Sequence, residues 1–341
     1  RDADSASTSA PAGGSAREER FRRALAEPTV DLRKLRELAW SGVPPELRPQ
    51  VWRLLLAYVP CGSDRREATL GRKRMEYKGW VRQYYEEVDE VERAEDDAAT
   101  LRQIGVDVPR TAPGVAFFRR DDIQRSVERI LYIWAIRHPA SGYVQGINDL
   151  VTPFLAVFLS EHMEGGMDGW DVGTLPTGRL YEVEADCYWC LSRLLDSVQD
   201  HYTAEQPGIQ KLVIKLSELV HRIDAPLHAH LEAEGIQFIQ FAFRWVNCLL
   251  LRELPFGLVV RLWDTYLSEG DGFSDYLAYA CAALLISFAP RLKEMEFQDI
   301  MMFIQKLPTQ EWDVAHLETE VLSRAHMWRL LFDRAQSHLH G

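Results

Sequence analysis

The sequence predicts an all-α protein of two helical subdomains packed against each other. From Asp31 onward, apolar residues recur at spacings of three and four in one segment after another, which is the pattern of amphipathic helices. The alternation of apolar and polar residues that marks a strand is missing nearly throughout. We therefore expect helices packed on helices, with an N-terminal subdomain over about residues 30–180 and a C-terminal subdomain over about residues 181–338.

The composition excludes several classes of protein. The chain has 341 residues, of which 47% are hydrophobic, enough for an extended core. Its formal net charge of −12 argues against nucleic-acid binding, which needs a basic surface. No apolar run reaches the roughly 20 residues of a membrane span, and the first residues lack the apolar core of a signal peptide. We expect a soluble, cytoplasmic protein that reaches a membrane only indirectly.

The cysteines and histidines do not form a recognisable metal site. The five cysteines are odd in number and scattered, which is typical of reduced thiols. Cys187 and Cys190 form a C-x-x-C pair inside a helical pattern, without a second pair at zinc spacing, so we interpret them as core residues. His221, His228 and His230 lack an adjacent set of carboxylates. We therefore interpret them as satisfied or exposed histidines.

The first elements are set by residues that break or start helices. Residues 1–16 are rich in Ser, Ala, Gly and Pro, and we expect them to form a disordered tail. The Pro44-Pro45 pair breaks the chain before a helix from about Leu47 to Tyr58. Within that helix Arg48 and Trp52 share a stripe on which the guanidinium can lie near the indole. They either tie the helix to the core or contact a partner, and we assign neither a catalytic role.

Three further segments of the first half predict helices. Residues 73–94 are charged and only loosely amphipathic, which indicates a solvated helix. The Asp121-Asp122 pair can cap the helix that follows it. From Ile147 to Phe158 nearly every residue is apolar, so this helix should run through the core, with Pro153 tolerated near its first turns.

The second half predicts one helix after another and should mainly brace the first. Residues 165–178, rich in Gly, Asp and Thr, indicate a long surface loop before it. Trp263 and Asp264 are interpreted as a structural signature, with Asp264 bonded to backbone or to an arginine. Helical periodicity is expected, with a break at Pro226, over residues 182–200, 209–223, 238–251, 255–267, 274–287, 297–307 and 311–335.

The first candidate segment for chemistry ends in an arginine. Ile104, Asp107 and Arg110 follow each other at steps of three, which places an apolar residue, a carboxylate and a guanidinium on one side of a helical turn. Pro109 should push Val108 out of the helical region and end the turn, leaving Arg110 on a loop beside Asp107. A guanidinium held in this way suits phosphate oxygens that gather charge during phosphoryl transfer.

The second candidate segment lies around Gln145, 35 residues after Arg110. Gly142 and Gly146 flank Tyr143-Val144-Gln145, and they allow unusual dihedrals and the close approach of another backbone. The carboxamide of Gln145 both donates and accepts, which suits the orientation of an attacking water. A helix of about 25 Å between the segments leaves room for a return turn, so the loops can lie side by side. The spacing alone also fits a surface ion pair followed by an ordinary start of a helix.

Four motifs occur in order along the chain: G-V-P-P-E-L-R-P-Q-V-W at Gly42–Trp52, I-x-x-D-x-x-R at Ile104–Arg110, Y-V-Q-G at Tyr143–Gly146 and R-L-W-D-T-Y-L-S-E-G at Arg261–Gly270. Together they resemble the TBC domain of Rab GTPase-activating proteins, and most of all the Gyp1-like, TBC-twenty-two-like branch. The resemblance covers about residues 35–335. It implies a single Rab-GAP TBC domain over residues 17–341.

The resemblance also implies a mechanism. In that family an arginine and a glutamine act in trans as a dual finger on a Rab-family GTPase, and here those positions are Arg110 and Gln145. The residues expected to support or orient them are Asp107, Ile104, Tyr143 and Gly146. The resemblance implies that GTP and Mg²⁺ are carried by the GTP-bound Rab. We therefore expect no metal and no cofactor on this chain, and no turnover of a substrate of its own.

Two functions remain open at this point. The first is activation of Rab GTPases in vesicle trafficking, with peripheral association at Golgi or other endomembranes through the Rab. The alternative is a non-catalytic TBC scaffold that binds a GTPase or a Golgi adaptor without accelerating hydrolysis. The presence of both Arg110 and Gln145 disfavours the alternative, because a degenerate member need not keep either.

Overall fold

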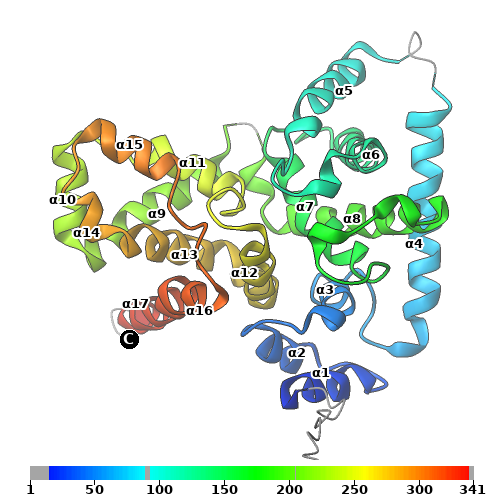
Figure 1. The fold of residues 1–341 in the computed structure, drawn as a ribbon, viewed down its shortest axis with the longest axis horizontal. Coiled ribbons are helices and arrows are strands. Elements are labelled where there is room, and N and C mark those ends of the chain that lie inside the picture. Colours follow the sequence, from blue (N-terminus) through cyan, green and yellow to red (C-terminus); the bar gives the residue numbers. More distant parts are fainter. Residues whose placement is uncertain (1–14, 89–92, 204, 338–341) are drawn as a thin grey trace, which may run out of the picture.

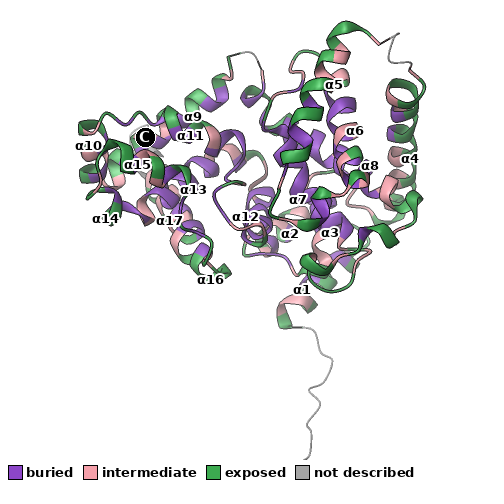
Figure 2. Ribbon diagram, turned by 45° about the horizontal axis from the view of Figure 1, so that its top comes forward, coloured by how far each residue is buried: buried purple, intermediate pink, exposed green. Residues whose placement is uncertain are grey.

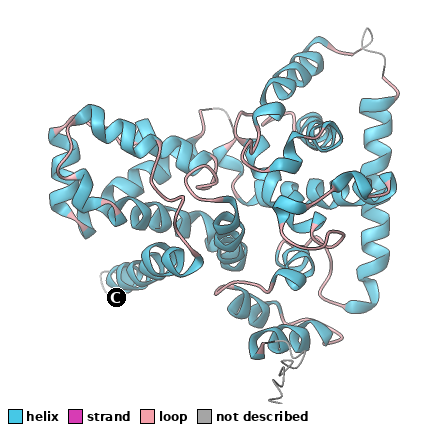
Figure 3. Cartoon of the chain, viewed as in Figure 1, coloured by secondary structure: helices cyan, strands magenta, loops and turns pink. Residues whose placement is uncertain are grey.

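The computed structural model describes residues 15–88, 93–203 and 205–337. Within these ranges the chain forms helices joined by loops (Figure 3). An isolated bridge pairs Thr29 with Gly62. The predicted all-α class is confirmed. None of the described helices combines the length and the apolar character that a membrane span requires.

The helices divide into those before and those after residue 203. The first set comprises α1 (Ala16–Ala26), α2 (Leu32–Ala39), α3 (Arg48–Leu55), α4 (Arg66–Val81), α5 (Glu95–Asp107), α6 (Asp121–Arg137), α7 (Ile147–Leu159) and α8 (Thr177–Ser197). The second set comprises α9 (Pro207–Ile223), α10 (Ala225–Ala233), α11 (Ile239–Asn247), α12 (Phe256–Glu269), α13 (Phe273–Ser287), α14 (Ala289–Leu292), α15 (Phe297–Gln305), α16 (Val314–Leu317) and α17 (Arg324–Ser337). The expected loop over 165–178 holds two 3₁₀ turns before α8 begins.

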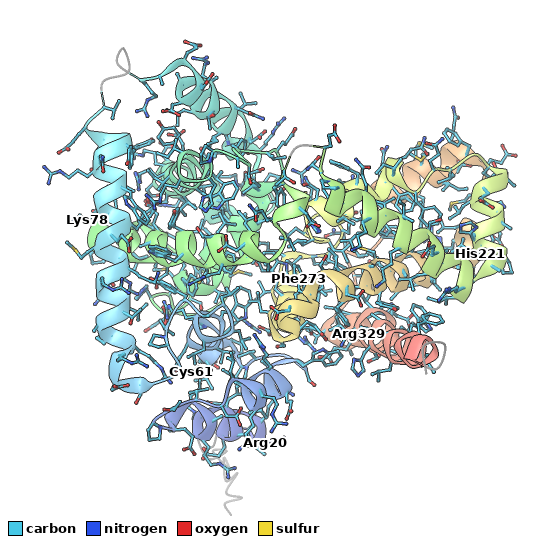
Figure 4. All side chains as sticks on the ribbon, turned by 180° about the vertical axis from the view of Figure 1, so that it is seen from behind. Arg20, Cys61, Lys78, His221, Phe273 and Arg329 are labelled. Atoms are coloured by element: carbon cyan, nitrogen blue, oxygen red, sulfur yellow. The ribbon has the colours of Figure 1, made fainter. Side chains whose placement is uncertain are left out.

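The two sets of helices meet at α12 (Figure 1). Helix α12 contacts α2, α3 and α7 on one side and α13 on the other. Phe273, at the start of α13, lies near this junction (Figure 4). Helix α8 packs against α4, α6 and α7, and it spans the expected subdomain boundary at about 180/181. The change from one half to the other comes after Ser197, where α8 ends.

Helix α7 lies in the core of the first half (Figure 2). All of its residues from Ile147 to Leu159 are buried, as their apolar sequence predicts. Pro153 lies in the interior of this helix and offers no N–H to the carbonyl of Asp149. The hydroxyl of Thr152 donates to that carbonyl at 2.7 Å instead. A threonine beside the proline therefore satisfies the backbone acceptor that the proline would leave free.

Helices α1 and α10 were not predicted from the sequence. Ser15 caps α1 and Ala16 is its first residue, so this end of the expected tail over residues 1–16 is helical, while residues 1–14 lie outside the described part. Pro226, expected to break the chain, is near the start of α10. A proline is compatible with the first turn of a helix because the N–H it lacks has no partner there. Asp224 caps α10 by accepting from the backbone N–H of Leu227 at 2.9 Å.

Helix α4 is less solvated than its charged sequence predicts. It lies at the edge of the molecule, with the exposed Lys78 on its outer side (Figure 4). On its inner side Tyr77 and Val81 are buried, and Arg74 forms a 2.8 Å ion pair with Asp186 of α8. The expectation that the helix over 73–94 is solvated is therefore wrong for the inner face of α4. A buried tyrosine and an ion-paired arginine form part of that face in place of aliphatic residues, so the sequence looks less amphipathic than the helix is. Cys187 and Cys190 are buried in α8, as predicted.

Candidate functional site

A cavity of about 560 Å³ lies between the two halves of the chain. Arg110 and Gln145 both line it. The other lining residues of the first half are Ala112, Pro113, Gly114, Val115, Asp149 and Thr152, and those of the second half are Leu251, Arg252, Leu254, Phe256 and Gln310. The structure therefore brings the two candidate residues to one cavity. The second half supplies a wall of that cavity as well as bracing the first half.

Arg110 reaches the cavity from a 3₁₀ turn, η4 (Val108–Arg110), that directly continues α5. The expectation that Pro109 would push Val108 out of the helical region is wrong, because Val108 has φ −56° and ψ −47°. Val108 is buried, and the hydroxyl of Thr111 donates to the carbonyl of Asp107 at 3.0 Å, which stabilises the continued turn. The chain becomes extended only at Thr111. Arg110 is thus the last residue of a helical turn.

Asp107 holds Arg110 as the spacing predicts. The Nε of Arg110 donates to Asp107 Oδ1 at 3.1 Å, and a terminal nitrogen of the same guanidinium donates to the same oxygen. The hydroxyl of Tyr143 donates to Asp107 Oδ2 at 2.7 Å. Burial, reinforced by Asp107, raises the pKa of Tyr143, so its phenol remains a donor. The Asp107 side chain is 3% exposed and that of Arg110 is 56% exposed, so the guanidinium is fixed from below and open at the cavity.

Gln145 lies on an exposed turn between two glycines with positive φ. Gly142 has φ +62° and Gly146 has φ +110°, which confirms the predicted need for unusual dihedrals. The close approach at Gly146 comes from the side chain of Asn247 and not from another backbone: a Cβ at Gly146 would overlap Asn247 Nδ2. That same nitrogen donates to the carbonyl of Gln145 at 3.0 Å.

Asn148 links the two candidate loops. Its Oδ1 accepts from the N–H of Gly146 at 3.0 Å, and its Nδ2 donates to the hydroxyl of Thr111 at 2.8 Å. The Thr111 hydroxyl in turn donates to the carbonyl of Asp107. Asn148 and Thr111 are both buried, so these bonds are shielded from water. Neither residue was predicted from the sequence, although each lies within three positions of a candidate residue.

Asp149 and Arg252 join the first and second halves at the cavity. Arg252 Nε donates to Asp149 Oδ2 at 2.8 Å, and a terminal nitrogen lies 2.7 Å from the same oxygen. Burial raises the pKa of Asp149, and Arg252 opposes this shift. Arg252 thus brings a second carboxylate-held guanidinium to the cavity. This pair lies more than 100 residues apart in sequence, and no local pattern predicts it.

The four residues interpreted as a structural signature lie together where α3 meets α12. Asp264 accepts from Trp52 Nε1 at 2.7 Å, from Arg48 Nε at 3.0 Å and from the N–H of Val43 at 2.9 Å. Trp52 stacks on Trp263 with ring centroids 6.2 Å apart. Asp264 therefore bonds to both an arginine and backbone, as expected. None of these residues lines the cavity.

Ile104 is fully buried near the end of α5, three residues before Asp107. Its apolar contact fixes the last turn of α5, from which Asp107 and Arg110 project. Ile104 therefore acts through packing, and it is not among the residues that line the cavity.

The chain matches a family model and several known proteins. Residues 45–293 match the model described as Rab-GTPase-TBC domain. The chain is 50% identical over 323 residues to the GTPase-activating protein gyp1 of Schizosaccharomyces pombe, and the match covers 94% of this chain and 62% of that protein. It is 49% identical over 321 residues to TBC1 domain family member 22B of Homo sapiens, covering 94% of this chain and 63% of that protein. The chain therefore spans less than two thirds of the length of these relatives.

The fold matches a solved structure of similar title. The crystal structure of the Ypt/Rab-GAP domain of Gyp1p superposes with a TM-score of 0.87 at 42% sequence identity, covering 93% of this chain and 98% of that one. The similarity thus includes sequence, fold and nearly the whole length of the solved domain. The family match covers well over half of the chain. This protein is a member of the Rab-GTPase-TBC domain family.

Proposed function

We propose that this chain is a GTPase-activating protein that accelerates GTP hydrolysis by a Rab-family GTPase in its GTP-bound form. Membership of the Rab-GTPase-TBC family supports this proposal. The observation that carries it is the cavity where the partly exposed Arg110, fixed by the buried Asp107, lies with Gln145. An arginine with free donors and a neutral amide are the two groups that a slow GTPase active site can receive from outside.

In this proposal GTP and Mg²⁺ are carried by the partner GTPase, and this chain supplies side chains only. The planar guanidinium of Arg110 would donate to oxygens of the transferring phosphoryl group as they gain charge. An arginine finger supplied in trans contributes a factor of about 10³ to 10⁵ in rate, which corresponds to roughly 4 to 7 kcal/mol. Gln145 would align the attacking water, donating with its amide nitrogen and accepting with its amide oxygen.

The contacts beneath Arg110 explain how it would be ready before the partner arrives. Asp107 accepts from Arg110 through one oxygen and from Tyr143 through the other. The buried hydroxyl of Tyr143 thus orients the carboxylate from one side, and the carboxylate orients the guanidinium on the other. A group that is already in place avoids the entropic cost of ordering a long side chain during the reaction.

A single-turnover assay of GTP hydrolysis tests this function. A panel of GTP-loaded Rab proteins is mixed with saturating amounts of this chain, and phosphate release is followed over time. We expect at least one Rab to be accelerated by about 10³-fold or more. Binding to a GTP-loaded Rab without acceleration would instead establish the non-catalytic scaffold.

We further propose that the chain acts in vesicle trafficking, and that it reaches Golgi or other endomembranes from the cytoplasm through its Rab partner. The partner class of the family supports this. A fluorescent fusion should lose its membrane signal when the partner Rab is depleted. A signal that persists without the Rab would point to a separate membrane contact.

A further inference from the structure

Asn247 contacts the Gln145 loop from the second half of the molecule. It is the last residue of α11, it is 5% exposed, and its Nδ2 donates to the carbonyl of Gln145 at 3.0 Å. We propose that Asn247 is a positioning residue that sets the backbone of Gln145 for the reaction. This inference rests on the proposed function, since Asn247 would act on hydrolysis only through Gln145.

The fit at Gly146 shows how closely the two segments meet. A side chain at Gly146 would overlap the donating nitrogen of Asn247, and Gly146 has φ +110°, which other residues rarely adopt. Both the space and the dihedral therefore require glycine. The Gln145 turn is shaped to admit the amide of Asn247.

The chemistry of the contact requires an amide in one orientation. With Nδ2 toward Gln145, a donor faces a carbonyl oxygen. The opposite orientation would place two acceptors against each other. In the described part of the chain the Oδ1 of Asn247 is buried without a hydrogen-bond partner, so the bond to Gln145 is what the amide gains in this position. An aspartate of nearly the same shape would present only acceptors to the Gln145 carbonyl.

Asn247 is itself held in place. The hydroxyl of the buried Tyr202 donates to the carbonyl of Asn247 at 2.7 Å. Five residues further on, Arg252 bonds to Asp149 in the first turn of α7. The segment that follows α11 thus contacts the Gln145 turn at one point and the helix after it at another.

The Gln145 backbone is therefore held from two sides. Asn148 accepts from the N–H of Gly146 within the first half, and Asn247 donates to the carbonyl of Gln145 from the second half. The Gln145 side chain itself is exposed, so the position of its carboxamide depends on its backbone. Because a displacement of about 1 Å in a reacting group can cost about 10²-fold in rate, loss of the Asn247 bond should lower the catalytic step.

The test uses Asn247→Asp, Asn247→Ala and a matched control, Tyr276→Phe. Tyr276 also makes a buried hydrogen bond to a backbone carbonyl of the second half, that of Leu322 at 3.0 Å, but it does not contact the cavity. We expect both Asn247 variants to lower the single-turnover rate at saturation by about 10- to 100-fold, with Rab affinity changed less than about threefold. The Tyr276→Phe variant should hydrolyse at the wild-type rate, and melting temperatures identify any variant that fails to fold.

A double-mutant cycle separates positioning from general damage. If Asn247 acts through Gln145, Asn247→Ala should not lower the single-turnover rate further when Gln145 is already alanine. In the Arg110→Lys protein it should lower that rate by the same factor as in the wild type. Equal losses in both backgrounds would overturn the proposal. So would wild-type rates in both folded Asn247 variants.

Hydrogen exchange tests the same contact without any GTPase. The amide N–H of Gly146 should exchange faster than in the wild type in both Asn247 variants, and at the wild-type rate in Tyr276→Phe. If wild-type protein activates no Rab, the proposed function fails, while the exchange result still decides whether Asn247 orders the turn. Unchanged exchange at Gly146 would contradict the positioning role even if hydrolysis falls.

Discussion

Two of the arginines that pair with buried aspartates have different surroundings. Arg110 bonds to Asp107 beside the cavity, and Arg48 bonds to Asp264 where the two halves meet. Both aspartate side chains are at most 3% exposed, but the Arg110 side chain is 56% exposed and that of Arg48 is 16% exposed. The pairs have the same chemistry and differ in what their remaining donors can reach.

The Nε and one terminal nitrogen of Arg48 donate within the fold. Arg48 also donates to the carbonyl of Val43 at 2.8 Å, while Asp264 receives the indole N–H of Trp52. Among the described residues, the hydrogen bonds of Arg110 go to Asp107 alone. A largely buried guanidinium that bonds to two groups of the fold thus indicates a structural arginine. An exposed guanidinium held by one carboxylate indicates an arginine available to a partner.

The largest effect is expected on stability at the structural pair. In Asp264→Asn one acceptor oxygen becomes a donor that faces N–H groups, and the charge of Arg48 loses its partner. Breaking a buried ion pair on one side costs about 3 to 5 kcal/mol. Urea unfolding should show this loss, whereas the hydrolysis rate per folded molecule should stay near wild type. A loss of less than about 1 kcal/mol would show that Asp264 is not a main support of the junction.

Arg110→Lys should have the largest effect on activity. Lysine keeps the charge but loses the planar fork, so the stimulated rate should fall at least about 100-fold while Rab affinity and melting temperature change little. Arg48→Lys is the matched control and should lower stability more than activity. Near-normal stimulation by Arg110→Lys would remove Arg110 from its proposed role.

The smallest effect is expected at Asp107, whose carboxylate holds Arg110. Asp107→Asn keeps the shape of the side chain but weakens the hold on Arg110, so the stimulated rate should fall by about tenfold. Stability should fall by about 1 kcal/mol, since one hydrogen bond to Arg110 or Tyr143 is lost. In the same urea titrations and rate assays, Asp264→Asn should lose more stability than Asp107→Asn, and Asp107→Asn should lose more activity than Asp264→Asn. If Asp107→Asn unfolds the protein while the rate of the folded fraction is normal, Asp107 is structural and its orienting role is lost.

The local parts of the site could be predicted from the sequence. Asp107 and Arg110 lie one helical turn apart, so their contact follows from spacing alone, and the glycines at 142 and 146 mark the unusual turn. Asn247 on Gln145 and Arg252 on Asp149 could not be predicted, because about 100 residues separate each pair and only the packing of the halves brings them together. The sequence thus predicted the contact within the first half, and it missed the contacts that come from the second half.

The fold shows the same limit. The all-α class followed from periodicity, but Pro226, interpreted as a break, lies in the first turn of α10. A proline that ends one helix and a proline that begins another look alike in isolation. The expected boundary between the halves, at about 180/181, falls within α8. Helix α8 joins the first half through contacts with α4, α6 and α7, and its own sequence does not encode those partners.

The most direct test of the dual-finger account removes a glutamine from each of the two proteins in turn. Phosphate release is measured under single-turnover conditions for wild type and Gln145→Ala, each with a Rab carrying its own switch glutamine or leucine in its place. If Gln145 aligns the water, the Rab substitution should leave much of the stimulated hydrolysis intact, and Gln145→Ala should remove most of it with either Rab. A strong loss from the Rab substitution beside a weak loss from Gln145→Ala would contradict the account and leave Arg110 as a single finger.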